Sequence, residues 1–176
     1  MKFATASPIL RLMALLALLF FGAIFGFFFA WVCSTMWGLD AANPVVAVAA
    51  MQAMNEAVRN AVFFPAFFLT PVVGALTAYV AWRGGYRTAC GAFLAASLVY
   101  AVGAFLPTAT VNVPMNEALA AQGPVESVER AAEIWAAYSP DWQWWNTART
   151  LASGVALLLV GWAMLSISNL QQAPAN

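Results

Sequence analysis

Long apolar runs separated by polar connections dominate the pattern of this chain. The runs cover residues 9–37, 61–82, 88–106 and 147–167. Each run approaches or exceeds the ~20 residues that an α-helix needs to cross the hydrocarbon core of a bilayer. The pattern predicts an all-α, integral membrane four-helix bundle with up-down topology, in which residues 1–176 form a single domain.

Prolines and turn residues predict the remaining helix ends. Pro107 is expected to close the third run, because proline lacks the N–H that continues a helix. Residues 125–138 are typical of a short amphipathic helix on the outer face, and Ser139-Pro140 is expected to begin the last helix. Residues 45–60 also suit a helix, either a separate amphipathic one or the first half of the second long helix.

Composition indicates that the bilayer, and not water, surrounds most of this chain. Hydrophobic residues make up 64% and charged residues only 8%, with a mean hydropathy of +0.79. Soluble domains are about 45–50% apolar and about 25% charged. Seven Lys and Arg balance seven Asp and Glu, so the basic excess that nucleic-acid binding needs is missing. The expected partner is membrane lipid, and nucleic acid is excluded.

The basic residues predict the orientation. Lys2 and Arg11 precede the first run, and Arg83 and Arg87 lie between the second and third runs, on the same side if four helices span. The acidic residues between 126 and 141 fall on the other side. By the positive-inside rule both termini are expected in the cytoplasm, in a bacterial inner membrane, with the two long connections facing outward.

The absence of histidine narrows the chemistry. It removes the commonest metal ligand and the usual general base. Cys33 and Cys90 lack metal or disulfide spacing and are interpreted as small buried thiols. The sequence therefore predicts neither a metal nor a cofactor.

Three pairs of polar residues stand at helical spacing near the predicted outer face. They are Asn55 with Arg59, Asn112 with Asn116, and Asn146 with Arg149. Residues three or four apart share a helix face, so an up-down bundle would bring the pairs together. Arg149 stands inside an apolar run, where a charge costs about 2.5–3.5 kcal/mol, and is expected to face the interior. Its candidate carboxylate partners are Glu56, Glu117 and Asp141.

Two interpretations of these pairs stay open. Asparagines near proline and at helix ends cap or turn the chain, and an arginine near a membrane face ties helices together or reaches the headgroups. Alternatively, amide and guanidinium donors surround a pocket and stabilise negative charge on a ligand oxygen. Four tryptophans would either roof such a pocket or form an ordinary interfacial belt: Trp135, Trp142, Trp144 and Trp145.

The same residues resemble the anthrone-oxygenase-like membrane family. The similar segments are 51–55, Arg59-Asn60, Phe67-Phe68 before Thr70-Pro71, 112–116, Trp135, and Trp145-Asn146 with Arg149-Thr150, across about residues 22–165. The resemblance implies a four-helix membrane fold. Some fungal members are associated with oxidising anthrones to anthraquinones.

What the resemblance implies about sites covers only the six residues of the three pairs. If the protein is an enzyme of this type, we expect these pairs to hold the oxygen of an anion, Glu56 or Glu117 to remove a proton, and Trp135, Trp145 and Met115 to bind the substrate. The expected function is binding or oxidising a flat hydrophobic small molecule, polyketide- or quinone-like, as a cofactor-independent oxygenase. The alternative is a non-enzymatic accessory subunit or lipid-binding module of a larger membrane protein complex.

Overall fold

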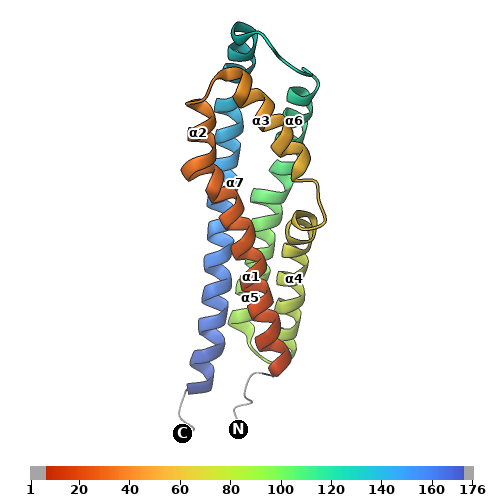
Figure 1. The fold of residues 1–176 in the computed structure, drawn as a ribbon. Helices are drawn as coiled ribbons and strands as arrows, with labels where there is room; N and C mark the ends of the chain where they lie inside the picture. The colour runs from red at the N-terminus through yellow and green to blue at the C-terminus, as the bar shows by residue number, and fades with distance from the viewer. Residues whose placement is uncertain (1–6, 173–176) are drawn as a thin grey trace.

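Four long apolar helices make up most of the protein. The computed structural model describes residues 7–172, with side chains up to residue 168, so Lys2 lies outside the described residues. The helices long and apolar enough to cross a membrane are Pro8–Asp40, Phe63–Arg83, Arg87–Ala120 and Val128–Ser168. The predicted all-α fold with four long apolar helices is confirmed (Figure 1).

The helical segments follow one another with few breaks. The first long helix joins α1 (Pro8–Ala30), a π-helical turn (Trp31–Thr35) and α2 (Met36–Asp40), and it is followed by α3 (Pro44–Ala57) and α4 (Phe63–Arg83). The third long helix joins α5 (Arg87–Tyr100), π-helical turns at Ala101–Phe105 and Thr108–Asn112, and α6 (Val113–Ala120). The last is α7 (Val128–Gln172).

The segment before α4 is a separate helix, which decides between the two possibilities for residues 45–60. Asn43 caps α3 by accepting from the Val45 N–H at 2.9 Å, with Pro44 in the first turn. After the turn at 58–62, the Asn60 side chain accepts from the Phe63 N–H at 2.9 Å and starts α4. A side-chain cap therefore starts α3, and the Asn60 side chain orders the turn that leads into α4.

Two predicted helix ends are wrong, because neither Pro107 nor Pro140 interrupts its helix. Next to Pro107, two π-helical turns and the Thr108 hydroxyl, which donates to the Ala104 carbonyl at 2.9 Å, satisfy backbone groups locally. The predicted amphipathic helix at 125–138 and the last run form the single helix α7. Tertiary packing of the outer half of α7 against α3 and α6 outweighs the hydrogen bond that Pro140 removes.

The four long helices form an antiparallel ring. α1 packs against α4 and α7, and α5 packs against the same two helices (Figure 1). Glycines permit the closest approaches: a Cβ at Gly103 would lie 2.5 Å from the Ala152 Cβ, and one at Gly74 would lie 2.3 Å from the Ser97 Oγ. Small residues at these contacts let the helix backbones approach closely.

Two clusters of buried apolar side chains form the core. The inner cluster fills the ring of four helices around Phe21, Phe93 and Tyr100. The outer cluster lies beyond it, where Met51 of α3 and Trp135 of α7 pack together. Of the two cysteines, Cys33 is exposed and Cys90 half-buried. The expectation that both are buried is wrong for Cys33, which lies on the exposed side of the π-helical turn.

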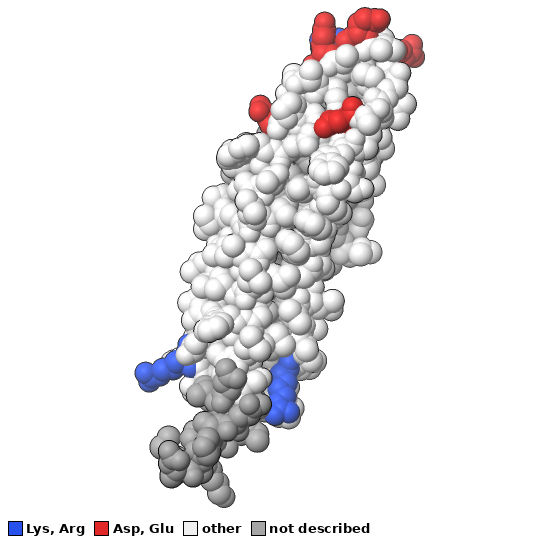
Figure 2. Space-filling view, turned by 90° about the vertical axis from the view of Figure 1, so that its left-hand side faces the viewer, with Lys and Arg blue, Asp and Glu red and all other residues white. Residues whose placement is uncertain are grey.

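Charged side chains gather at the two ends of the bundle. Arg11 lies in the first turns of α1, Arg83 ends α4 and Arg87 begins α5. Figure 2 shows the basic side chains near the termini and the acidic ones toward the opposite end.

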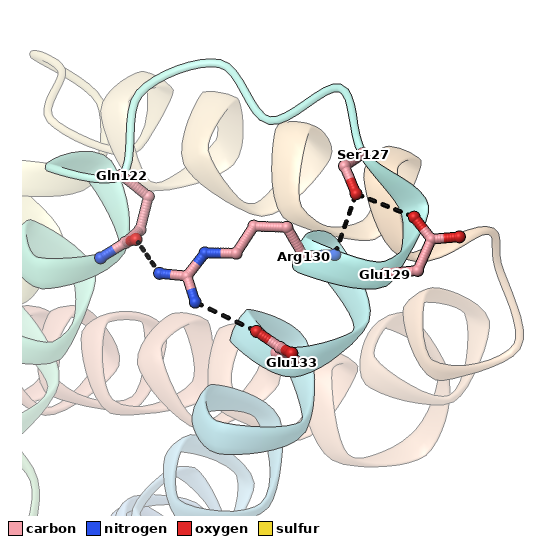
Figure 3. A network of polar contacts seen from close by, with 5 residues as sticks. All are labelled: Gln122, Ser127, Glu129, Arg130 and Glu133. Carbon is pink, nitrogen blue, oxygen red and sulfur yellow. Dashed lines mark hydrogen bonds and ion pairs between the residues drawn. The ribbon is translucent and has the colours of Figure 1, made fainter.

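A polar network at the acidic end starts α7. Ser127 accepts from the Arg130 N–H at 3.2 Å and donates to Glu129 at 2.9 Å. The Arg130 guanidinium donates to Glu133 and Gln122, each at 3.2 Å (Figure 3). This network ties α7 to the preceding connection.

Candidate functional site

A cavity of about 320 Å³ lies where the two core clusters meet. The inner cluster contributes Phe28 and Phe67 to its wall, and the outer cluster contributes Trp142. This volume falls at the lower end of the roughly 300–1,000 Å³ typical of small-molecule sites, which also combine apolar walls with a few polar groups.

The three polar pairs converge on this cavity. All six residues line it: Asn55, Arg59, Asn112, Asn116, Asn146 and Arg149. They come from the end of α3 and its following turn, from the junction of the π-helical turn with α6, and from the middle of α7. The antiparallel arrangement of the helices places these three segments at the same level along the bundle axis.

Arg149 is a buried cation beside the cavity, with only 4% of its surface exposed. Its Nη1 donates to the Thr108 Oγ1 at 3.0 Å and its Nη2 to the Asn146 Oδ1 at 3.1 Å. Its Cζ lies 4.7 Å from the ring centroid of Phe28 and 5.3 Å from that of Trp142, within range of cation–π attraction. Its Nε is buried and has no hydrogen-bond partner among the described residues.

None of the three expected carboxylates pairs with Arg149 in the described part of the chain. Glu117 instead forms an ion pair with Arg59 at 3.7 Å between Oε1 and Nη2. Glu56 and Asp141 are exposed and line no part of this cavity. A buried charge without a counter-ion is costly, so the site is electrostatically suited to an anion.

Asn112 provides a second unsatisfied group. Its side chain is 1% exposed, and neither its Oδ1 nor its Nδ2 has a hydrogen-bond partner among the described residues. Leaving a buried polar group unpaired costs about 1–3 kcal/mol. Because the side chain lines the cavity, a bound molecule would supply both the missing acceptor and the missing donor.

A hydrogen-bond network fixes the outer wall of the cavity. The Tyr138 hydroxyl donates to the Asn116 Oδ1 at 2.8 Å, and the Trp142 Nε1 donates to the same oxygen at 3.0 Å. The Asn55 Nδ2 donates to the Tyr138 hydroxyl at 3.4 Å. The network joins α3, α6 and α7. Asn55, Asn116 and Trp142 line the cavity, and Tyr138 positions them from behind the wall.

The three residues expected to bind substrate lie outside this cavity. Trp135 packs in the outer cluster and donates through Nε1 to the Asp40 Oδ1 at 2.9 Å, which secures α2 to α7. Met115 packs against the same cluster. Trp145 is half-buried and meets the exposed Trp144 edge-on at 4.8 Å. Trp135 lies two helical turns nearer the start of α7 than Trp142, which does line the cavity.

Thr108 and Phe28 contact Arg149 but were not predicted from the sequence. Thr108 stands four residues before Asn112, which is helical spacing, but the expected helix end at Pro107 hid that relation. Trp142 stands seven residues, or two helical turns, before Arg149 and so shares its helix face, a relation that separates it from Trp144 but not from Trp145. Nothing in the sequence distinguishes Phe28 from the other phenylalanines of its run.

Fold and site together define an all-α protein with four helices long and apolar enough to cross a membrane, and with a cavity of mixed polar and apolar walls toward one end of its bundle. The chain belongs to the anthrone oxygenase family, whose family model matches residues 54–159, more than half of its length. The matched segment contains all six polar cavity residues, whereas the α1 wall precedes it. No curated protein and no solved structure matches the chain.

Proposed function

We propose that the protein binds a flat, apolar molecule carrying an acidic oxygen or carbon acid, and oxidises it as an oxygenase of the anthrone type. The observation that carries the proposal is the Arg149 guanidinium, buried against two aromatic rings with a free Nε–H and no carboxylate partner in the described residues. The family membership supplies the reaction class.

The cavity can stabilise the anion that this reaction needs. Loss of a proton from the methylene carbon of an anthrone gives an enolate whose charge lies largely on the former carbonyl oxygen. Two donors without a partner among the described residues, the Arg149 Nε–H and the Asn112 amide, would stabilise that oxygen in an apolar enclosure. The rings of Phe28 and Trp142 would contact the flat faces of the substrate.

Glu117 is the proposed base, because it is the one carboxylate that lines the cavity in the described part of the chain. Its side chain is 62% exposed, so a proton that it accepts can pass to water. The enolate then forms a carbon–oxygen bond with O₂, giving a hydroperoxide after protonation. Loss of the second proton and of hydroxide yields the quinone, so each anthrone consumes one O₂ and releases one water.

The test is oxidation of anthrone by the purified protein under air, followed by both O₂ uptake and anthraquinone absorbance. We expect the parent to accelerate quinone formation and Arg149→Ala to lose that acceleration. Arg130→Ala is the matched control, since Arg130 is an exposed arginine in the network at the acidic end. An Arg149→Ala variant as fast as the parent would remove the proposed site.

We also propose the orientation in which both termini face the cytoplasm of a bacterial inner membrane. Arg11, Arg83 and Arg87 support it, because they share one end of the bundle. In this orientation the cavity and Glu117 lie toward the outer face.

A further inference from the structure

An apolar groove leads from the outside of the bundle to the cavity wall. It has a volume of about 470 Å³ and lies between α1 and α4, below the turn that joins α3 to α4. Ala23 and Ala66 line its outer part, and its only polar lining residue is Asn60. Its walls belong largely to helices long and apolar enough to cross a membrane, so the groove faces the lipid side of the protein.

The groove and the cavity share one wall. Five residues line both hollows: Phe27, Trp31, Met54, Val58 and Phe63. The rings of Phe27 and Phe63 meet there with centroids 4.7 Å apart, one from α1 and one from α4. Both side chains are half-buried. Rotation of these two side chains would join the hollows without moving a helix, because rotamer changes are faster and smaller than backbone motions.

A hollow lined largely by polar residues adjoins the cavity between α3 and α6. It has a volume of about 640 Å³, is lined partly by Gln52 and Glu56, and shares four polar residues with the cavity. Those four are Asn55, Arg59, Asn116 and Glu117. The ion pair between Arg59 and Glu117 stands at this boundary, where both side chains are more than half exposed.

We infer that a lipid-dissolved substrate reaches the cavity sideways from the bilayer, through the groove between α1 and α4 and past Phe27 and Phe63, while the polar hollow serves water and protons. The inference rests on the proposed function, which makes the substrate flat and apolar. Such a molecule is concentrated in the bilayer, because each Å² of apolar surface kept from water contributes about 25 cal/mol. Access from lipid also avoids separating the Arg59 and Glu117 ion pair.

Alanine-to-phenylalanine variants test the route in proteoliposomes. The probe is 9,10-anthraquinone, the unreactive product, and its binding is followed by stopped-flow quenching of tryptophan fluorescence, since Trp31 and Trp142 line the cavity. Ala23→Phe narrows the groove, Ala53→Phe narrows the polar hollow, and Ala75→Phe lies on the exposed side of α4 away from both. All three alanines are exposed, so the added rings leave the core packing intact.

Ala23→Phe is expected to slow association and dissociation several-fold by the same factor, leaving the dissociation constant unchanged, because an obstruction outside a site alters rates and not affinity. Ala57→Phe, a second groove variant, should act in the same direction. Ala53→Phe and Ala75→Phe should match the parent. Slowing by Ala53→Phe alone, or a changed dissociation constant in Ala23→Phe, would overturn the inference.

The outcomes for the parent separate this inference from the proposed function. A parent that binds anthraquinone but does not oxidise anthrone contradicts the proposed oxygenase, while the four alanine-to-phenylalanine variants still decide the route. A parent that binds no anthraquinone overturns both.

Discussion

Replacing Arg149 by methionine distinguishes between two roles of this residue: binding a ligand, and only holding helices together. Methionine keeps much of the length and apolar stem of the side chain but removes its charge. In the unliganded protein, the two hydrogen bonds to Thr108 and Asn146 contribute about 1.5–3 kcal/mol each, because the guanidinium is charged. Burying the uncompensated charge costs about 2.5–3.5 kcal/mol on insertion scales. The two terms oppose each other, so the free energy of unfolding should fall by only about 1–2 kcal/mol.

Ligand binding should respond far more strongly to the same change. A hydrogen bond to a charged group contributes about 1.5–3 kcal/mol, and about 1.4 kcal/mol corresponds to a factor of ten in affinity. Arg149→Met should therefore weaken anthraquinone or enolate-analogue binding by roughly 10- to 100-fold. Arg149→Lys keeps the charge but loses the planar guanidinium with its several N–H donors. Its ligand affinity should therefore fall between those of Arg149→Met and the parent.

The assay pairs thermal unfolding in detergent with equilibrium binding on the same preparations. Arg130→Met is the control, because that arginine is exposed and lies in the network at the acidic end. The reasoning is refuted if Arg149→Met unfolds several kcal/mol more easily while its ligand affinity stays at the parent value. That result would make Arg149 a structural tie between α7 and its neighbours.

Three further outcomes are expected. Asn112→Leu, which removes an unsatisfied buried amide at similar volume, should stabilise the unliganded protein by about 1–3 kcal/mol and weaken ligand binding; lower thermal stability would contradict this. Gly103→Val should destabilise by about 1–3 kcal/mol, because its Cβ would meet Ala152, whereas Gly91→Ala, with nothing within 4 Å, should not; equal melting temperatures would contradict the packing. A phosphatase fused to the C-terminus should be inactive and a cytoplasmic fluorescent fusion bright, and the reverse pattern would invert the proposed orientation.

The elements predicted from the sequence differ from the structure mainly at prolines. The prediction at Pro107 applied a rule for isolated helices, in which the missing N–H and the ring clash end the helix. In the folded chain, the π-helical turns and the Thr108 hydroxyl compensate locally for the hydrogen bond that Pro107 removes. Packing against α7 keeps the helix continuous past the proline. The same applies at Pro140, where the outer half of α7 is buried against α3. Neither compensation is visible in local sequence.

The candidate site was predicted in part. Spacing placed Asn146 and Arg149 on one helix face, and the up-down topology brought them near Asn112 and Asn116. Spacing did not exclude Trp135 or Met115, because it gives the helix face on which a residue lies but not the position of the cavity along the bundle axis. The structure shows their side chains in the outer cluster.

The sequence by itself determined that this is an all-helical chain with four long apolar helices. Run length and the scarcity of charge are local properties, and in hydrocarbon such a run must form a helix to satisfy its backbone hydrogen bonds. It also determined which polar groups lie toward one end. Only the tertiary structure decided that, among the described residues, Arg149 has no carboxylate partner and Asn112 is left unpaired, and that an apolar groove adjoins the cavity at Phe27 and Phe63. Those features depend on distances between side chains from different helices, which the packing of the ring sets and no single segment encodes.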